Sequence, residues 1–265
     1  MARLRFTILG CGSSGGVPRL GGHWGACDPA NPKNNRTRCS MLVERFQGDA
    51  VTRVLIDTSP DMRQQLLNAN VGQLDGVVYT HEHADHTHGI DDLRMIVINM
   101  RARLAVWANA ATKADLMARF AYAFVRPEGS DYPPILELND LNGPVVVTGA
   151  GGDIELAPFE VVHGNINALG FRIDDLAYLP DVSEIPPAAW DRLEGLKYWV
   201  LDCLRYTPHP SHTHLEQSLE WIARAGPENA VLTNLHIDLD HDVLDGETAG
   251  HIKPAFDGMT LEMDT

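Results

Sequence analysis

The sequence has few cysteines and no long apolar run. Its 265 residues include four cysteines, which are widely separated and form no CxxC pair, so neither a disulfide framework nor a zinc knuckle is indicated. No apolar run reaches the ~18 residues that a membrane-spanning helix needs, and the first residues lack the pattern of a signal peptide. We therefore expect a soluble cytoplasmic protein that makes no membrane contact.

Positive charge is also scarce. Lysine and arginine number 21 against 36 acidic residues, which gives a formal net charge of −15. This charge repels a phosphate backbone at long range, so nucleic acid is disfavoured as a partner. One basic stretch, from Lys33 to Arg38, is either a solvated loop or a place where Arg36 and Arg38 bind one small anionic substrate. The sequence leaves open whether the chain forms a homodimer.

Short β-branched runs and amphipathic segments alternate along the chain. One helix is expected to begin at Pro60 with Ser59 as its N-cap, and another to end at Gly226. We also expect helices at 93–100, 112–124 and 215–225, and strands at 6–9, 51–56, 77–79, 145–148, 159–162, 169–173, 199–202 and 230–235. Glycine-rich breaks at 143–144 and 149–152 are short enough to be hairpin turns, so we expect one domain over residues 1–265.

Four side chains of metal-ligand type follow the expected strand at 77–79. They are His81, His83, Asp85 and His86. A loop that leaves a strand end lets ligands converge on a fixed base, and imidazole with carboxylate suits zinc and related divalent ions. Surface histidines without a metal are the alternative, but four such groups would repel one another or compete for protons if no cation were present. The motif therefore predicts metal binding.

Further ligands are expected at other strand ends, because two metals need about six or seven protein ligands. His163, Asp181 and His236 each come directly after an apolar run. Taken singly, each could equally be a solvated or core residue. Asp57, at the end of another run, either orients a ligand histidine or caps the turn before Ser59.

The order of these ligand-type residues resembles the metallo-β-lactamase fold superfamily, and the resemblance covers nearly the whole chain. It implies an α+β fold, a four-layer αββα sandwich, that holds two divalent metal ions, zinc or alternatively manganese or iron. By this resemblance, one metal would be held by His81, His83 and His163, the other by Asp85, His86 and His236, and both by Asp181. A water between two cations loses a proton near neutral pH and becomes the nucleophile.

Two further segments resemble the phosphodiesterase branch of this superfamily, which includes phosphoribosyl cyclic phosphodiesterase and the tRNA 3′-processing endonuclease. They are the glycine loop at 10–18 and the motif at 211–214. By the resemblance, His212 contacts the scissile phosphate and protonates the leaving oxygen, and His214 orients His212 or binds the phosphate. Asp85 is also a catalytic candidate. The alternative is that Ser211 caps a helix and the two histidines are merely exposed.

The glycine loop also matches a dinucleotide-binding fingerprint, because Gly10, Gly12 and Gly15 have the required spacing. That fingerprint needs a helix at the glycines, and Pro18 breaks any helix there. We therefore expect the loop amides, with Ser13 or Ser14, to line a substrate pocket.

Two departures from the branch limit the substrate. Of the cysteine cluster that holds an extra structural zinc in relatives, the chain keeps only Cys27, so this zinc is not expected. A glycine-rich basic segment for gripping tRNA is also missing from the sequence. We therefore expect a hydrolase of a small cyclic or nucleotide-like phosphodiester. The alternatives are a thioester or lactone hydrolase on the same metal site, and a metal-binding protein without turnover.

Overall fold

Two seven-stranded sheets carry most of the regular structure. The structure is a computed structural model, and it describes residues 2–126, 128–129 and 131–265. The chain divides into two units: unit 1 comprises Met1–Leu9, Ser40–Glu155 and Thr260–Thr265, and unit 2 comprises Gly10–Cys39 and Leu156–Met259. The prediction of one domain over residues 1–265 stays a prediction.

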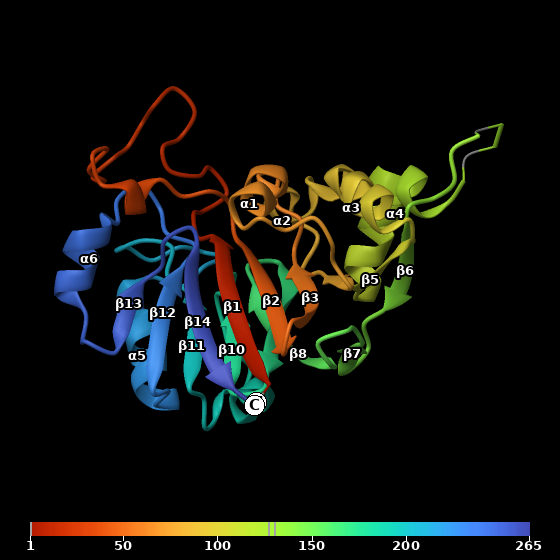
Figure 1. The fold of residues 1–265 in the computed structure, drawn as a ribbon. Coiled ribbons are helices and arrows are strands. Elements are labelled where there is room, and N and C mark those ends of the chain that lie inside the picture. The colour runs from red at the N-terminus through yellow and green to blue at the C-terminus, as the bar shows by residue number, and fades with distance from the viewer. Residues whose placement is uncertain (1, 127, 130) are drawn as a thin grey trace. The chain divides into compact units, whose positions relative to one another are not determined.

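The first sheet joins strands from both ends of the chain (Figure 1). Its strand order is β14 (Met259–Asp264), β1 (Arg3–Gly10), β2 (Ser40–Gln47), β3 (Ala50–Ile56), β4 (Gly76–Val78), β5 (Leu104–Ala108) and β6 (Leu136–Asp140). Strands β2 and β3 pair in antiparallel fashion, whereas the pairs β3–β4, β4–β5 and β5–β6 are parallel. Parallel neighbours need crossover connections, and here these contain α1 (Met62–Asn68), α2 (Ala84–Thr87), α3 (Leu93–Met100) and α4 (Ala110–Phe124).

The core of unit 1 lies between these strands and helices. Leu55, Val77 and Val106 from the strands are fully buried, and they belong to one apolar cluster with Ile96 of α3 and Leu116 of α4. Burying such side chains is the main source of stability in this layer. Strand β4 is buried along its whole length and reads in the sequence as part of an apolar run, whereas β6 is buried only at Leu136.

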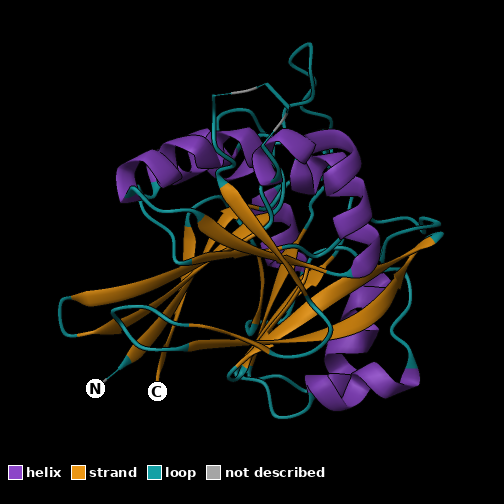
Figure 2. Cartoon of the chain, turned by 90° about the vertical axis from the view of Figure 1, so that its right-hand side faces the viewer, coloured by secondary structure: helices purple, strands orange, loops and turns teal. Residues whose placement is uncertain are grey.

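The second sheet has the order β13 (Ile252–Pro254), β12 (Asn229–Thr233), β11 (Tyr198–Asp202), β10 (Leu176–Leu179), β9 (Ile166–Ile173), β8 (Ile154–His163) and β7 (Val145–Val147). From β10 to β13 neighbouring strands are parallel, and β8, β9 and β10 are antiparallel to one another in turn. The strands twist along their length (Figure 2). Trp199 and Leu201 pack with Ile222 of α5 (Leu215–Ala225) and Leu244 of α6 (His241–Glu247).

Most of the expected elements are present. The helices predicted at 93–100 and 215–225 are confirmed as α3 and α5, and Gly226 ends α5 in the left-handed conformation with φ 63°. The predicted hairpin turn at 149–152 joins β7 to β8. A Cβ atom on Gly151 would lie 2.1 Å from the carbonyl oxygen of Arg45, so glycine is required at this turn.

Two expectations were wrong or incomplete. The helix expected to begin at Pro60 begins at Met62, because the Ser59 hydroxyl and carbonyl accept the backbone N–H groups of Asp61 and Met62 in a preceding turn. Strand β2 was not predicted, since Glu44 interrupts its apolar pattern. Glu44 is nevertheless buried, and it is paired with Arg5 at 2.5 Å and Arg53 at 2.9 Å. Among the described residues, no helix is long and apolar enough to cross a membrane.

Candidate functional site

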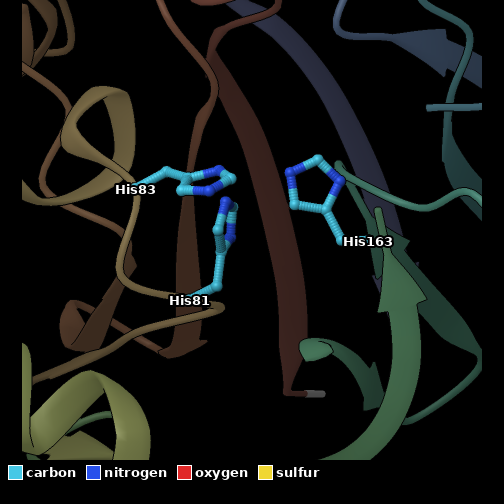
Figure 3. Close-up of side chains that lie close together, drawn as sticks. All are labelled: His81, His83 and His163. Carbon is cyan, nitrogen blue, oxygen red and sulfur yellow. The ribbon is translucent and has the colours of Figure 1, made fainter. Parts of the chain in front are cut away.

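The histidine motif of unit 1 follows β4: His81 and His83 precede α2, and Asp85 and His86 belong to α2. The ring centroids of His81 and His83 are 4.7 Å apart, and those of His81 and His86 are 4.3 Å apart. Figure 3 shows the His81 and His83 rings turned toward one another, and it also labels His163, the last residue of β8. His81 and His86 are buried. The structure thus gathers three of the four motif side chains into one cluster of imidazoles.

Asp57 fixes the orientation of this cluster. Its carboxylate accepts hydrogen bonds from the Thr80 backbone N–H at 2.8 Å, the Thr80 hydroxyl at 2.7 Å and Nδ1 of His86 at 2.8 Å. Asp57 has a left-handed backbone with φ 64°, which allows this return toward the motif, and burial raises the pKa of its carboxyl. Of the two roles weighed for Asp57, the contacts support orientation of a histidine.

The same network sets the proton position on His81. The Thr80 hydroxyl gives its hydrogen to Asp57, so the 2.9 Å contact between Thr80 Oγ1 and His81 Nδ1 requires that Nδ1 be the donor. His86 likewise donates from Nδ1 to the Asp57 carboxylate. In both rings the Nε2 atom therefore carries the lone pair. Asp85 lies beside the cluster, with Oδ2 3.7 Å from Nε2 of His86.

A second cluster of ligand-type atoms lies in unit 2. His163, Asp181 and His212 each offer one ligand atom, and these atoms lie within 4.8 Å of one another. His163 donates from Nδ1 to the Ser211 carbonyl at 2.6 Å, and its Nε2 is 3.5 Å from Asp181 Oδ2. The segment that follows β10 carries Asp181, which is buried. Two of the three further ligands predicted for unit 2 are thus close together.

Asp202, the last residue of β11, holds His212 in place. Its Oδ2 accepts a hydrogen bond from His212 Nδ1 at 2.9 Å, and its Oδ1 accepts one from Asn234 at 3.1 Å. Asp202 is fully buried, and this burial raises the pKa of its carboxyl. The sequence analysis missed Asp202. The signal was present, because Asp202 ends an apolar run in the same way as His163 and Asp57 do.

His236 lies outside that cluster. Its Nδ1 is 2.6 Å from Asp238 Oδ1, and its Nε2 contacts the Arg19 guanidinium. His214 is the residue that precedes α5, and its side chain makes no capping hydrogen bond. The metal role of His236 and the catalytic role of His214 stay predictions.

The predicted substrate contacts differ in exposure. Ser13 is buried and Ser14 is exposed, whereas Arg38 is partly buried. Arg36 is buried, and its guanidinium donates to Asn34 Oδ1 at 3.1 Å and to the His236 carbonyl at 3.4 Å. The structure therefore gives Arg36 an internal role in supporting the segment that carries His236. The substrate role assigned to these four residues stays a prediction.

A buried carboxylate links the start of the glycine loop to Thr37. Asp257 accepts hydrogen bonds from the backbone N–H groups of Cys11 and Thr37, at 3.1 and 2.8 Å, and from the Thr37 hydroxyl at 2.6 Å. Burial raises the pKa of Asp257 to about 6 in spite of these bonds. The loop that contains Ser13 and Ser14 therefore depends on a titratable group.

This link predicts a pH-dependent stability. The folded chain binds the Asp257 proton more tightly than the unfolded chain, whose pKa is about 3.9, so the contribution of this group is fully present below about pH 4 and is lost as pH rises through about 6. We expect the free energy of unfolding of Asp257→Asn, relative to wild type, to rise by on the order of 2 kcal/mol between pH 4 and pH 8. Urea unfolding at several pH values measures it. If the free energy of unfolding changed with pH in the same way in both proteins, the raised pKa of Asp257 would be contradicted.

Comparisons with known proteins agree with the fold. Residues 52–237 match the family model described as the beta-lactamase superfamily domain. A curated relative from Porphyromonas gingivalis (strain ATCC BAA-308 / W83), named octanoyltransferase, is 35% identical over 266 residues, which cover 98% of this chain and 52% of that relative. The chain thus spans about half the length of that relative.

Solved structures extend the likeness over nearly the whole chain. A structure described as a new diphosphatase from the PhnP family is 33% identical, with a TM-score of 0.87, and the match covers 99% of this chain and 98% of that one. The short form of human tRNase Z has a TM-score of 0.66 at 13% identity, with 97% and 98% covered, which shows a shared fold. The α+β fold class of the metallo-β-lactamase type is therefore confirmed.

The resemblance stated from the sequence is confirmed with it. Most of the chain matches one family model, and a 33% identical protein has the same fold over almost its full length. The chain therefore belongs to the beta-lactamase superfamily and has the fold of its metal-dependent hydrolases.

Proposed function

We propose that the protein is a binuclear metal-dependent phosphodiesterase that acts on a small cyclic or nucleotide-like phosphodiester. The observation that carries this proposal is the Asp202–His212 pair. A buried carboxylate holds Nδ1 of His212 at 2.9 Å, and this keeps the ring in place beside Asp181, whose Oδ2 is 3.9 Å from the same nitrogen. A positioned acid of this kind helps an alkoxide to leave. Likeness to a protein described as a diphosphatase supports the same reaction class.

The donor set fits divalent metal ions. His86 donates from Nδ1 to Asp57, His81 to Thr80 and His163 to the Ser211 carbonyl, so Nε2 would be the ligand atom of each ring. Metal-ligating histidines in proteins commonly show this arrangement. Histidine nitrogens with carboxylate oxygens suit zinc first, and manganese or iron as alternatives.

The residues that would hold the two ions are those of the family pattern. We assign one ion to His81, His83 and His163, the other to Asp85, His86 and His236, and both to Asp181. When bound, divalent ions supply Lewis acidity and lower the pKa of water.

The other residues of the chain would bind the substrate and move protons. His212 would give a proton from Nε2 to the leaving oxygen, and Asp202 would keep the ring in position and favour its protonated form. His214 and Asp85 are further catalytic candidates, and Ser13, Ser14, Arg36 and Arg38 are candidates for substrate contacts. Because the net charge is −15, we propose a small substrate in the cytoplasm rather than tRNA.

Hydrolysis of a thioester or lactone is the second candidate. It is favoured by the relative named octanoyltransferase, whose name refers to an acyl group, although the chain matches about half of that relative. The same activated water and Lewis acid would attack a carbonyl carbon. Metal binding without turnover is the remaining alternative.

The experiment is a substrate panel with zinc-loaded protein and with protein stripped by a chelator. The panel contains cyclic nucleotides, dinucleoside diphosphates, an octanoyl thioester and a lactone. We expect zinc-dependent turnover of the phosphate esters. Turnover of the thioester or lactone alone would overturn the proposal in favour of the second candidate, and zinc binding without any turnover would favour the third.

A further inference from the structure

Arg19 lies against a residue of the predicted metal site. Its guanidinium contacts Nε2 of His236, and both residues belong to unit 2. Nδ1 of His236 is 2.6 Å from Oδ1 of the Asp238 carboxylate. The Arg19 guanidinium can only donate, so Nε2 of His236 is the acceptor in their contact. Nδ1 is therefore the donor, and Nε2 offers its lone pair to Arg19.

The backbone around Arg19 is fixed while its side chain remains exposed. The Arg19 N–H donates to the His23 carbonyl at 2.9 Å, and the Arg19 carbonyl accepts from Gly22 at 3.0 Å and His23 at 3.2 Å. Gly15 lies under the side chain, since a Cβ atom built there would be 3.3 Å from Nε of Arg19. The guanidinium can thus move by rotation of its own side chain while its Cα stays in place.

The lone pair that Arg19 uses is the one that a metal ion on His236 would need. Only one cation can take it, so Arg19 and the ion exclude each other at Nε2. Once the ion is bound, the guanidinium is released but remains tethered close to it. Two neighbouring cations repel, and an anion between them relieves this repulsion. A planar guanidinium also matches the oxygens of a phosphate group with two parallel hydrogen bonds.

We propose that Arg19 is a substrate-binding residue that holds a phosphate oxygen of the substrate beside His236 in the metal-loaded protein. This inference deepens the proposed function and rests on it. It assigns selectivity for phosphate esters over neutral thioesters or lactones to the side chain that directly follows the glycine loop, which the sequence analysis did not single out.

The test measures binding of inorganic phosphate to zinc-loaded protein by titration calorimetry, together with zinc per chain by elemental analysis. The variants are Arg19→Gln and Arg19→Lys, and the matched control is Arg192→Gln, which changes an exposed arginine of the same unit. Loss of a charge-assisted hydrogen bond is expected to raise the phosphate Kd of Arg19→Gln by about 10- to 100-fold. Arg19→Lys should fall between it and wild type, and Arg192→Gln should match wild type.

Zinc content provides the second readout. Arg19→Gln should bind zinc at least as tightly as wild type, because a competitor for Nε2 of His236 has been removed. The proposal is overturned if Arg19→Gln binds phosphate like wild type, if it loses zinc, or if zinc-loaded wild type binds no phosphate. Phosphate binding needs no turnover, so a protein that binds phosphate through Arg19 but hydrolyses no phosphodiester would refute the proposed function alone.

Discussion

Replacement of His212 by alanine is expected to lower kcat for a phosphodiester by about 10²- to 10⁴-fold, the usual contribution of general acid catalysis. The reason is the geometry of the ring, whose Nδ1 is bound to Asp202 at 2.9 Å and lies 3.9 Å from Asp181 Oδ2, so that Nε2 would be the nitrogen that gives a proton. A group held in this way loses no hydrogen bond when it gives its proton from Nε2. Steady-state kinetics of the zinc-loaded variant and wild type measure the change.

The choice of leaving group provides an internal control. A p-nitrophenolate leaves without a proton, so the loss in the His212→Ala variant should be much smaller for a p-nitrophenyl ester than for an alkyl ester. Zinc per chain should be unchanged. His212 is grouped with His163 and Asp181 as a set that could hold a metal, so a fall in zinc content with equal losses for both esters would make His212 a ligand instead. Asp202→Asn, a positioning variant, should shift the pH profile of kcat.

Replacement of Asp181 by alanine is expected to remove bound zinc and reduce turnover below detection. Asp181 is buried, and its Oδ2 lies 3.5 Å from Nε2 of His163. A carboxylate that serves two ions weakens both when it is lost, and removal of one partner also leaves neighbouring ligands without charge compensation. Zinc per chain after dialysis, measured by elemental analysis, should fall from about two to less than one.

Two controls separate metal loss from unfolding. Asp191→Ala removes an exposed carboxylate of the same unit and should keep the zinc content of wild type. Asp181→Asn keeps the shape of the side chain and one oxygen ligand, so it should fold and retain zinc only in part. If Asp181→Ala is folded by circular dichroism and carries as much zinc as wild type, Asp181 does not bridge the ions.

The sequence predicted the ligand-bearing segments better than the residues that support them. His81, His83 and His86 could be identified because they lie within six residues, where spacing alone brings them together. Asp202 could not be assigned to His212 in the same way, because that contact depends on which strands are neighbours. The parallel register that places Asp202 beside Thr233, one residue before Asn234, is a property of the folded sheet.

Buried charge explains the other differences. Glutamate and arginine side chains are seldom fully buried in proteins, yet Glu44 and Arg36 are buried with partners distant in sequence: Glu44 pairs with Arg5, and Arg36 donates to the His236 carbonyl. An ionised side chain is tolerated inside a protein only when such partners compensate its lost hydration. Composition and periodicity describe one segment at a time, so they do not reveal this compensation.

Strand pairing in unit 1 has a consequence for synthesis on the ribosome. β1 and β14 are neighbours in one sheet, Arg3 pairs with Glu262 at 3.3 Å, and the Thr265 N–H donates to the Ala2 carbonyl at 3.1 Å. The edge of β1 that pairs with β14 therefore stays uncovered until β14 has been synthesised, an interval in which unpaired edges invite aggregation. A circular permutant that joins residues 265 and 2 by a short linker and opens the tight turn at Gly48 would make these two strands consecutive and shorten that exposure.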